Sequence, residues 1–189
     1  MPSKHEITAA LFGAWRLMRF DASGMNWFDL TLDGFWRSFF AAVLVAPFFA
    51  LLVYLDPFHA AETTDTGSAI LLSAVVYAVG WAIVPVVAIL LTRLLGLSHG
   101  YVPLVVAYNW TSVPQIVLQA TVALISGLGL LPPGLAGILL FVAVVYILVY
   151  EWFVIRTALR TTTATAIGIV ILFEVLGIAL NLAAFSYLS

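Results

Sequence analysis

One carboxyl, Glu174, lies inside an otherwise uncharged apolar stretch, residues 161–189. Gly177 and Asn181 follow it at i+3 and i+7, so a helix would place all three residues on one face. A charge at the centre of a bilayer costs about 2.5–3.5 kcal/mol on insertion scales, so a carboxyl at this position indicates a candidate functional site. Two interpretations stay open. The group carries a proton or an ion, or it is a neutral structural acid that hydrogen-bonds to a neighbouring helix.

A polar stripe runs along a second uncharged stretch, residues 94–150. Its members recur at i, i+4, i+7 and i+11, with one amide beside the first: Tyr108, Ser112, Gln115, Gln119 and Asn109. Pro114 lies within the stripe and frees the carbonyl of Trp110 from its usual helical hydrogen bond. Backbone that is not helical at membrane depth is tolerated where it faces protein or a watery cavity.

We therefore predict that the stripe and the carboxyl converge on one polar site in the middle of the membrane. The predicted members of this site are Glu174, Asn181, Gln115, Gln119, Ser112 and Asn109. The alternative is that the stripe forms interhelical hydrogen bonds, each worth about 0.6 kcal/mol on average.

The sequence does not support other kinds of chemistry. It contains no cysteine, which excludes disulfides, thiolate metal sites and cysteine nucleophiles. The histidines His5, His59 and His99 are scattered, and no metalloprotease, nucleotide-binding or serine-hydrolase motif is present. Seven Lys and Arg against nine Asp and Glu do not form the basic cluster that nucleic acid requires. We therefore expect no enzymatic activity, no cofactor or metal ion and no nucleic-acid partner.

The elements that must position these residues are apolar helices. Hydrophobic residues make up 64% of the 189 positions and charged residues 8%, against about 25% charged in an ordinary soluble domain. A helix needs about 20 apolar residues to cross a hydrocarbon core of roughly 30 Å. Charges and the helix-breaking segment 126–134 divide the chain into five predicted spans, at about 37–55, 67–92, 102–126, 133–156 and 163–187. The predicted fold is an all-α integral membrane protein with a five-helix transmembrane domain at 37–189, with Ala164 and Gly168 at close helix contacts.

The distribution of basic residues predicts the orientation. All seven Lys and Arg lie in three places: residues 4–37, Arg93, and the link at Arg156 and Arg160. The alternate links, 56–65 and 126–134, contain none. Cytoplasmic loops carry an excess of Lys and Arg, so we expect a cytoplasmic N-terminus and an external C-terminus.

Residues 1–36 form an arm before the first predicted span. Within the segment 5–20, apolar side chains recur at the spacing of a helix that lies in the membrane interface: Ile7, Leu11, Ala14, Trp15 and Met18. A second amphipathic helix is expected after Ser23 as its N-cap, with Asp29, Asp33 and Arg37 in a polar ladder. The arm either anchors the first span or docks a cytoplasmic partner.

Basic and aromatic residues on both sides of the spans are predicted to contact lipid headgroups or the membrane interface. These residues are Arg16, Arg19, Arg37, Arg156, Arg160, Trp27 and Trp36.

Two segments of the chain resemble the YIP family of Ypt/Rab-interacting membrane proteins and their bacterial relatives. The first is Gly100-Tyr-Val-Pro-Leu-Val-Val-Ala-Tyr-Asn-Trp-Thr-Ser-Val-Pro114, and the second runs from Trp152 through Arg160 into Thr161-Thr-Thr-Ala-Thr-Ala166. In that family the third span typically opens with a small-residue turn and carries an aromatic residue followed by a proline. The resemblance covers about residues 37–187. It implies five spans, a scaffold or trafficking role in the eukaryotic members, and the inner membrane as the location in bacteria.

Two functions are consistent with these observations. We expect a structural or interaction protein, acting as a scaffold or accessory subunit, whose partners are the lipid bilayer and either another membrane protein or a second copy of the chain. The alternative is a small transporter or channel that works through Glu174 and the polar stripe. A scaffold tolerates Glu174→Gln, which keeps shape and hydrogen bonding, whereas a proton-coupled carrier loses activity with its fold intact.

Overall fold

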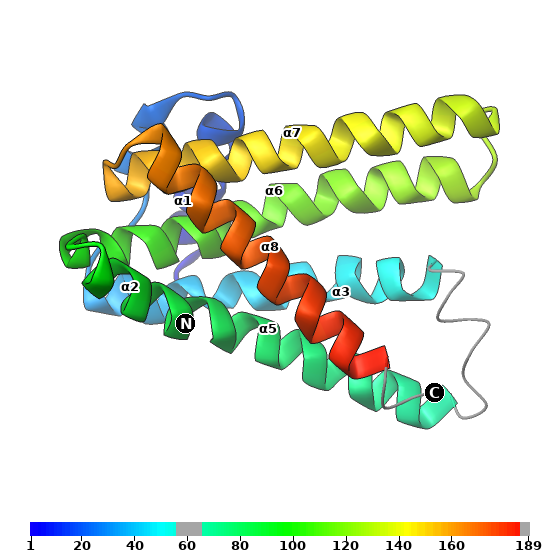
Figure 1. Cartoon of the computed structure of the whole chain (residues 1–189), viewed down its shortest axis with the longest axis horizontal. Coiled ribbons are helices and arrows are strands. Elements are labelled where there is room, and N and C mark those ends of the chain that lie inside the picture. Colours follow the sequence, from blue (N-terminus) through cyan, green and yellow to red (C-terminus); the bar gives the residue numbers. More distant parts are fainter. Residues whose placement is uncertain (56–65, 186–189) are drawn as a thin grey trace.

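The computed structural model describes residues 1–55 and 66–185, and regular structure in these residues is helical throughout. The elements in chain order are α1 (Lys4–Met18), the 3₁₀ turn η1 (Ala22–Trp27), α2 (Leu32–Ser38), α3 (Phe40–Leu55), α5 (Thr66–Leu94), the 3₁₀ turn η2 (Ser98–Gly100), α6 (Tyr101–Gly127), α7 (Pro133–Leu159) and α8 (Thr163–Phe185). The helices α3, α5, α6 and α7 run roughly along the long axis of the molecule (Figure 1). Helix α8 crosses them obliquely: it begins beside α7 and ends beside α5.

Helix α6 lies at the centre of the bundle. It packs against α3, α5 and α7, and the arm elements α1 and α2 also contact it. The side chains of Leu104, Val105 and Ala107 on its first turns are fully buried. A helix surrounded by protein does not need an apolar surface towards lipid, which is why the polar stripe can lie on this helix.

Four stretches of the described residues are long and apolar enough to cross a membrane: Leu32–Leu55, Ile70–Leu94, Pro133–Leu159 and Thr163–Ala184. These match four of the five predicted spans and indicate a membrane protein. Helix α6 coincides with the other predicted span, but it is less apolar because it carries the polar stripe, of which Asn109 is buried and Gln119 is exposed.

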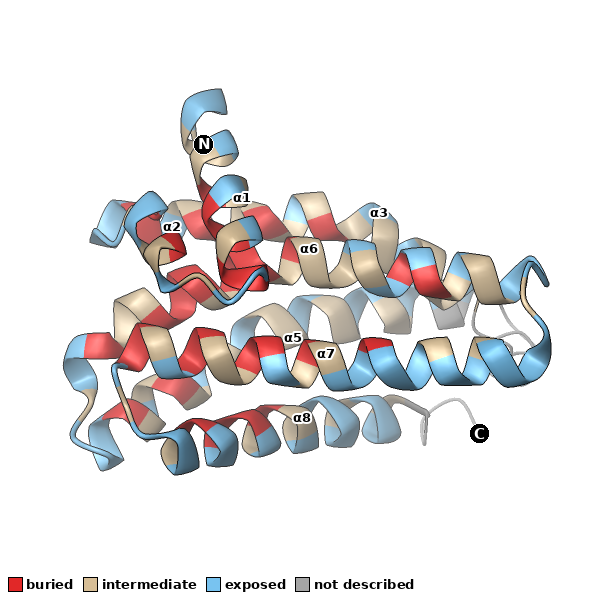
Figure 2. Cartoon of the chain, turned by 90° about the horizontal axis from the view of Figure 1, so that it is seen from above, coloured by how far each residue is buried: buried red, intermediate tan, exposed pale blue. Residues whose placement is uncertain are grey.

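The outer faces of the bundle are apolar and exposed. Phe141 on α7 has 70% of its surface exposed, and Leu182 on α8 has 64%. Figure 2 shows the same pattern along α7 and α8, where buried residues lie on the inner side and exposed residues on the outer side. Large exposed apolar faces of this extent are unfavourable in water but match the hydrocarbon of a bilayer.

The predicted turn between the third and fourth spans is confirmed. Helix α6 ends at Gly127 and α7 begins at Pro133. Between them, Gly129 has a φ of +64°, a left-handed conformation that glycine adopts without steric cost. Pro133 occupies the first position of α7, where its missing N–H removes no helical hydrogen bond.

The arm docks against the bundle rather than lying apart from it. Figure 2 shows α1 meeting the long helices at a steep angle. Its residues Ala14 and Leu17 are fully buried, and two tyrosines of α7 hold its last turns: the hydroxyl of Tyr150 donates to the carbonyl of Ala14 at 2.9 Å, and that of Tyr146 donates to the carbonyl of Met18. Two of the residues predicted on its apolar face, Ala14 and Met18, are buried, whereas Trp15 is 52% exposed.

The local structure of the arm corrects one predicted helix start. Ser23 is not an N-cap, because it lies inside η1, whose N-cap is Asp21. The second helix, α2, begins later and is capped by the hydroxyl of Thr31, which accepts from the amide of Gly34 at 3.1 Å. The reason is local: the Asp21 carboxylate accepts a hydrogen bond from the backbone amide of Ser23 and so caps the turn in its place.

The prediction that Ala164 and Gly168 make close helix contacts is wrong. Ala164 is exposed, and a Cβ added at Gly168 would meet no atom within 4 Å. Helix α8 instead packs through a neighbouring face, on which Ile169 and Phe173 are buried.

Candidate functional site

One member of the polar stripe connects helices. Asn109, with 2% of its surface exposed, donates from Nδ2 to the hydroxyl of Ser38 at 2.9 Å. The Ser38 hydroxyl in turn donates a hydrogen bond to the carbonyl of Phe35 at 2.7 Å. These two hydrogen bonds connect α6 to α2, so the Asn109 side chain forms an interhelical contact.

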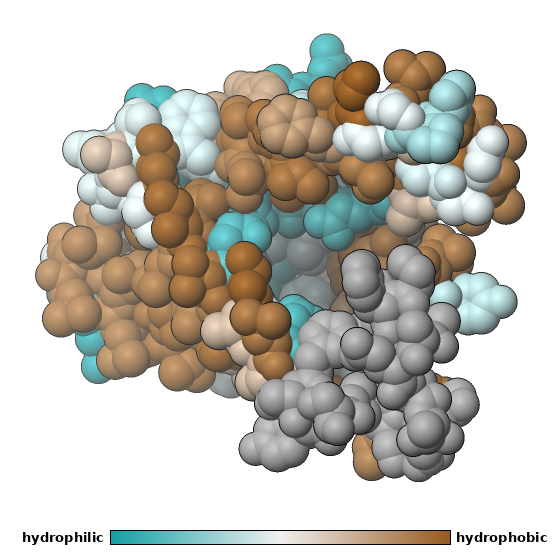
Figure 3. All heavy atoms as spheres, turned by 45° about the vertical axis from the view of Figure 1, so that its right-hand side comes forward, coloured by the Kyte–Doolittle hydropathy of each residue, from teal (hydrophilic) through white to brown (hydrophobic). Residues whose placement is uncertain are grey.

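A cavity of about 300 Å³ lies between α3, α5, α6 and α8. Its polar lining comes from Tyr108, Asn109 and Ser112 on α6 and from Asn181 on α8. Figure 3 shows hydrophilic atoms inside a hollow at the end of the molecule where α6 turns into α7. Ser112 and Asn181 satisfy one hydrogen bond on their own helices, because their side chains donate to the carbonyls of Asn109 and Gly177 at 2.7 and 2.8 Å.

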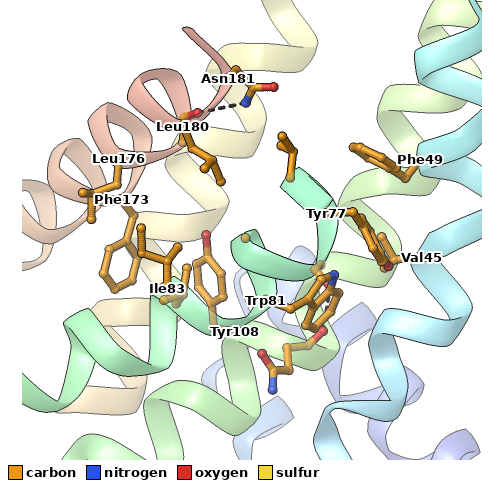
Figure 4. A pocket seen from close by; sticks show the side chains of 16 residues that line it. Val45, Phe49, Tyr77, Trp81, Ile83, Tyr108, Phe173, Leu176, Leu180 and Asn181 are labelled. Atoms are coloured by element: carbon orange, nitrogen blue, oxygen red, sulfur yellow. Dashed lines mark hydrogen bonds between the residues drawn. The ribbon is translucent and has the colours of Figure 1, made fainter. Parts of the chain in front are cut away.

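Aromatic rings form two opposite walls of this cavity (Figure 4). On the α6 and α8 side, Tyr108 and Phe173 meet edge to face, with ring centroids 5.4 Å apart. On the α3 and α5 side, Phe49 lies 4.8 Å from Tyr77, and Tyr77 lies 6.2 Å from Trp81. The Tyr77 hydroxyl donates to the carbonyl of Ala42 on α3 and so fixes its ring. The walls therefore present aromatic surface and a few polar atoms.

A carboxyl pair lies between α7 and α8. Glu151 on α7 is buried, with 6% of its surface exposed, and Glu174 on α8 is half-buried. The Glu151 carboxyl interacts with the neighbouring Glu174 carboxyl and with the Gln115 side chain. Two ionised carboxylates can only accept hydrogen bonds. Accordingly, the Oε2 atom of Glu151 has no donor among the described residues, and a proton on either acid would supply the missing bond.

Tyr108 links the carboxyl pair to the cavity. Its ring lines the cavity, and its phenol interacts electrostatically with both Glu151 and Glu174. Tyr108 on α6 is therefore next to both the cavity and the carboxyl pair.

The structure brings together only part of the predicted site. Asn109, Ser112 and Asn181 line the cavity, whereas Glu174 and Gln115 meet at Glu151 instead. Gln119 is exposed. The separation of Glu174 from Asn181 agrees with the oblique course of α8 (Figure 1), because Glu174 lies beside residues of α7 and Asn181 lines the cavity together with residues of α5.

Glu151 was missed as a site residue. The signal that could have found it is its position between Tyr150 and Trp152 in an apolar segment, because an acid flanked by aromatic residues there is expensive to expose to lipid. Arg156 forms no salt bridge with Glu151 among the described residues, and its guanidinium lies 5.6 Å from the centre of the Trp152 ring.

Two of the four basic residues within residues 4–37 form salt bridges within the protein. Arg16 pairs with Asp21, and Arg37 pairs with Asp29 and with Glu6 of α1 at 2.9 Å. The predicted ladder is therefore incomplete, since Asp33 makes no salt bridge among the described residues.

The acids of these pairs are held ionised by their neighbours. Hydrogen bonds from the side chain of Ser23, from Arg16 and from the backbone of Ser23 lower the pKa of Asp21 to about 2. Hydrogen bonds from Thr31, with Arg37 as a further partner, lower the pKa of Asp29.

The other residues predicted at the interface point outwards. Arg19, Arg156 and Arg160 are exposed, and the indoles of Trp27 and Trp36 are exposed by 44% and 71%. These positions leave them accessible to headgroups or to a partner.

The described residues contain no cluster of His, Asp and Glu with the geometry of a metal site. No family model, curated protein or solved structure matches the chain. The site must therefore be interpreted from its own geometry.

Proposed function

We propose that the protein is a small transporter in which the Glu151–Glu174 pair takes up and releases a proton within the membrane. The observation that carries the proposal is the unpartnered Oε2 atom of Glu151, facing a second carboxyl on the neighbouring helix. In this proposal the chain crosses a bacterial inner membrane five times, with α6 as the third span and the N-terminus in the cytoplasm.

Electrostatics supports a shared proton. Two like charges in adjacent side chains repel by several kcal/mol where the effective dielectric constant is about 20 or lower. The groups around the pair, Gln115, Tyr108 and Tyr150, carry no positive charge that would offset two carboxylates. In this proposal one proton shared by the two carboxyls offsets their repulsion, and its loss or gain is the event that transport uses.

The location of the pair also supports proton exchange. Glu151 lies eight residues before the end of α7 at Leu159, which corresponds to about 12 Å along a helix. On the other side, the phenol of Tyr108 borders the cavity. A proton could therefore enter from the cavity side through Tyr108 and leave towards the end of the bundle that carries the arm.

The experiment that tests this proposal is proton flux in liposomes that contain the purified protein and a trapped pH-sensitive dye. A pH step imposed across the wild-type liposomes is expected to decay faster than across protein-free liposomes. Glu151→Gln and Glu174→Gln should each reduce the protein-dependent rate by at least about tenfold, since proton relays typically contribute 10²–10⁴-fold. Asp33→Asn, an exposed acid in the arm, is the matched control and should keep the wild-type rate.

Infrared spectroscopy of the same samples detects the proton directly. The wild type should show the carbonyl stretch of a protonated carboxyl at neutral pH, and this band should disappear in Glu151→Gln. Folded Glu→Gln variants that move protons as fast as the wild type would refute the proposal.

A second function, that of a scaffold or accessory subunit, is favoured by the outer surface of the arm. Phe12, Trp15, Phe20 and Trp27 are all 42–52% exposed, and the Arg16 guanidinium lies over the Phe12 ring. Aromatic residues with arginine are typical of protein interfaces, and the resemblance to YIP proteins points the same way. Affinity purification in mild detergent tests it, because a scaffold should retain a stoichiometric membrane partner that Trp15→Ser releases.

A further inference from the structure

We propose that the aromatic cavity between α3, α5, α6 and α8 binds a small quaternary ammonium cation. That the cation is transported rests on the proposed function. That it binds depends on the cavity alone.

The aromatic walls are the first reason. Rings of Phe49, Tyr77 and Trp81 stand on one side of the cavity and rings of Tyr108 and Phe173 on the other (Figure 4). Ring faces carry negative electrostatic potential, and aromatic cages are the usual protein solution for binding an alkylated ammonium group. A strongly hydrated ion such as Na⁺ would need several oxygen ligands instead.

The charges around the cavity are the second reason. None of the described residues that line it is Lys, Arg, His, Asp or Glu, so none of them would select an anion or a primary amine through a salt bridge. Among the described residues, two acids interact with a lining side chain: Glu151 and Glu174 both interact electrostatically with Tyr108. Their field attracts a cation and repels an anion.

The dimensions and polar atoms set the size of the ligand. A volume of about 300 Å³ is at the lower end of the range for small-molecule sites, roughly 300–1,000 Å³. Asn181 and Ser112 offer hydrogen bonds to a hydroxyl on the ligand. A trimethylammonium group with a short hydroxylated chain satisfies all three features.

The position of Tyr108 suggests how binding and proton transfer are coupled. A cation against its ring lies beside the carboxyl pair, whose other titratable neighbours are Tyr150 and Tyr108 itself. The cation favours the doubly ionised pair, so its entry would expel the shared proton. In this step the O–H bond of the protonated acid breaks and the proton passes to water, so one positive charge replaces another.

Calorimetry in maltoside detergent, whose headgroup carries no ammonium, tests the binding. The probes are choline, tetraethylammonium, and the neutral isostere of choline in which a carbon replaces the ammonium nitrogen. We expect the two cations to bind and the isostere to bind at least about fivefold more weakly, because only the cations gain cation–π attraction. Equal affinity for choline and its isostere would overturn the assignment and show a general apolar site, and absence of binding by both cations would also overturn it.

A pair of variants locates the site. Trp81→Leu removes one ring face from the wall and should weaken choline binding by roughly 5- to 30-fold. Phe141→Leu, a matched loss of a ring on the exposed face of α7, should leave it unchanged. Thermal unfolding of both variants confirms that they fold, and a Trp81→Leu variant that is folded and binds normally counts against this cavity.

The two proposals can fail separately. Glu151→Gln should still bind choline but should release no proton into a weakly buffered solution on binding. Choline binding without proton flux in the wild type would support the cavity and refute the transporter. Proton flux without choline binding would do the reverse.

Discussion

The contact between Gly13 and Gly24 offers a sharp test of how the arm docks. A Cβ added at Gly24 would lie 2.5 Å from the carbonyl oxygen of Gly13 and 2.8 Å from Cγ of Leu17. The first neighbour is backbone, so the clash in Gly24→Ala is relieved only if η1 moves away from α1. Overpacking of this kind costs about 1–3 kcal/mol. Gly24 lies in a 3₁₀ turn, so little gain in α-helix propensity offsets that cost.

The assay is amide hydrogen exchange of α1 in detergent. If α1 exchanges by local opening, a cost of about 1–3 kcal/mol speeds exchange of the amides of residues 14–18 by roughly 5- to 150-fold. Exchange in α8 should not change, because the arm does not hold that helix.

Gly168→Ala is the matched control. It adds the same methyl group at a position where no atom lies within 4 Å, and alanine in a helix interior gains up to about 1 kcal/mol over glycine. This variant should be as stable as the wild type or slightly more stable. If Gly24→Ala protects α1 as well as the wild type does, the docked arm is refuted.

Three further predictions concern the polar contacts. Acid should weaken the arm, because the pKa of Asp21 is lowered from 3.8 to about 2. The stabilisation that ionised Asp21 contributes is complete above pH 3.8 and is lost as the pH falls towards 2. The difference in thermal stability between Asp21→Asn and the wild type should therefore vanish at the acid end of a pH series. Tyr150→Phe removes the hydrogen bond to the carbonyl of Ala14 and should destabilise the docked arm by about 1–3 kcal/mol, measured by the same hydrogen exchange, because the buried carbonyl loses its donor. A double-mutant cycle of Ser38→Ala and Asn109→Ala should give a coupling energy of about 0.6 kcal/mol, and at most roughly 1.7, in unfolding experiments; a value of zero would remove the interhelical role of Asn109.

Much of the architecture follows from the sequence because the solvent dictates it. Apolar stretches of about 20 residues, cut by charges and by the Gly and Pro residues of 126–134, define helices long enough to cross a bilayer. The boundaries of α7 and the turn before it were predictable for the same reason, since Gly129 and Pro133 permit little else. The polar stripe on α6 was also readable, because polar side chains on an apolar helix must face protein.

The course of each helix through the bundle was decided only by the tertiary structure. Periodicity places Glu174 and Asn181 on one face of α8, yet the tilt of that helix sends one towards α7 and the other towards α5. The same tilt brings Glu174 to Glu151, a residue 23 positions away, and no local pattern indicates that these two residues meet. The spacing of polar and apolar residues indicates which side of a helix faces protein. It does not fix which neighbouring helix that side faces, because lipid solvates the apolar side equally well in any arrangement of the bundle. Side-chain packing between the helices therefore determines which buried groups meet.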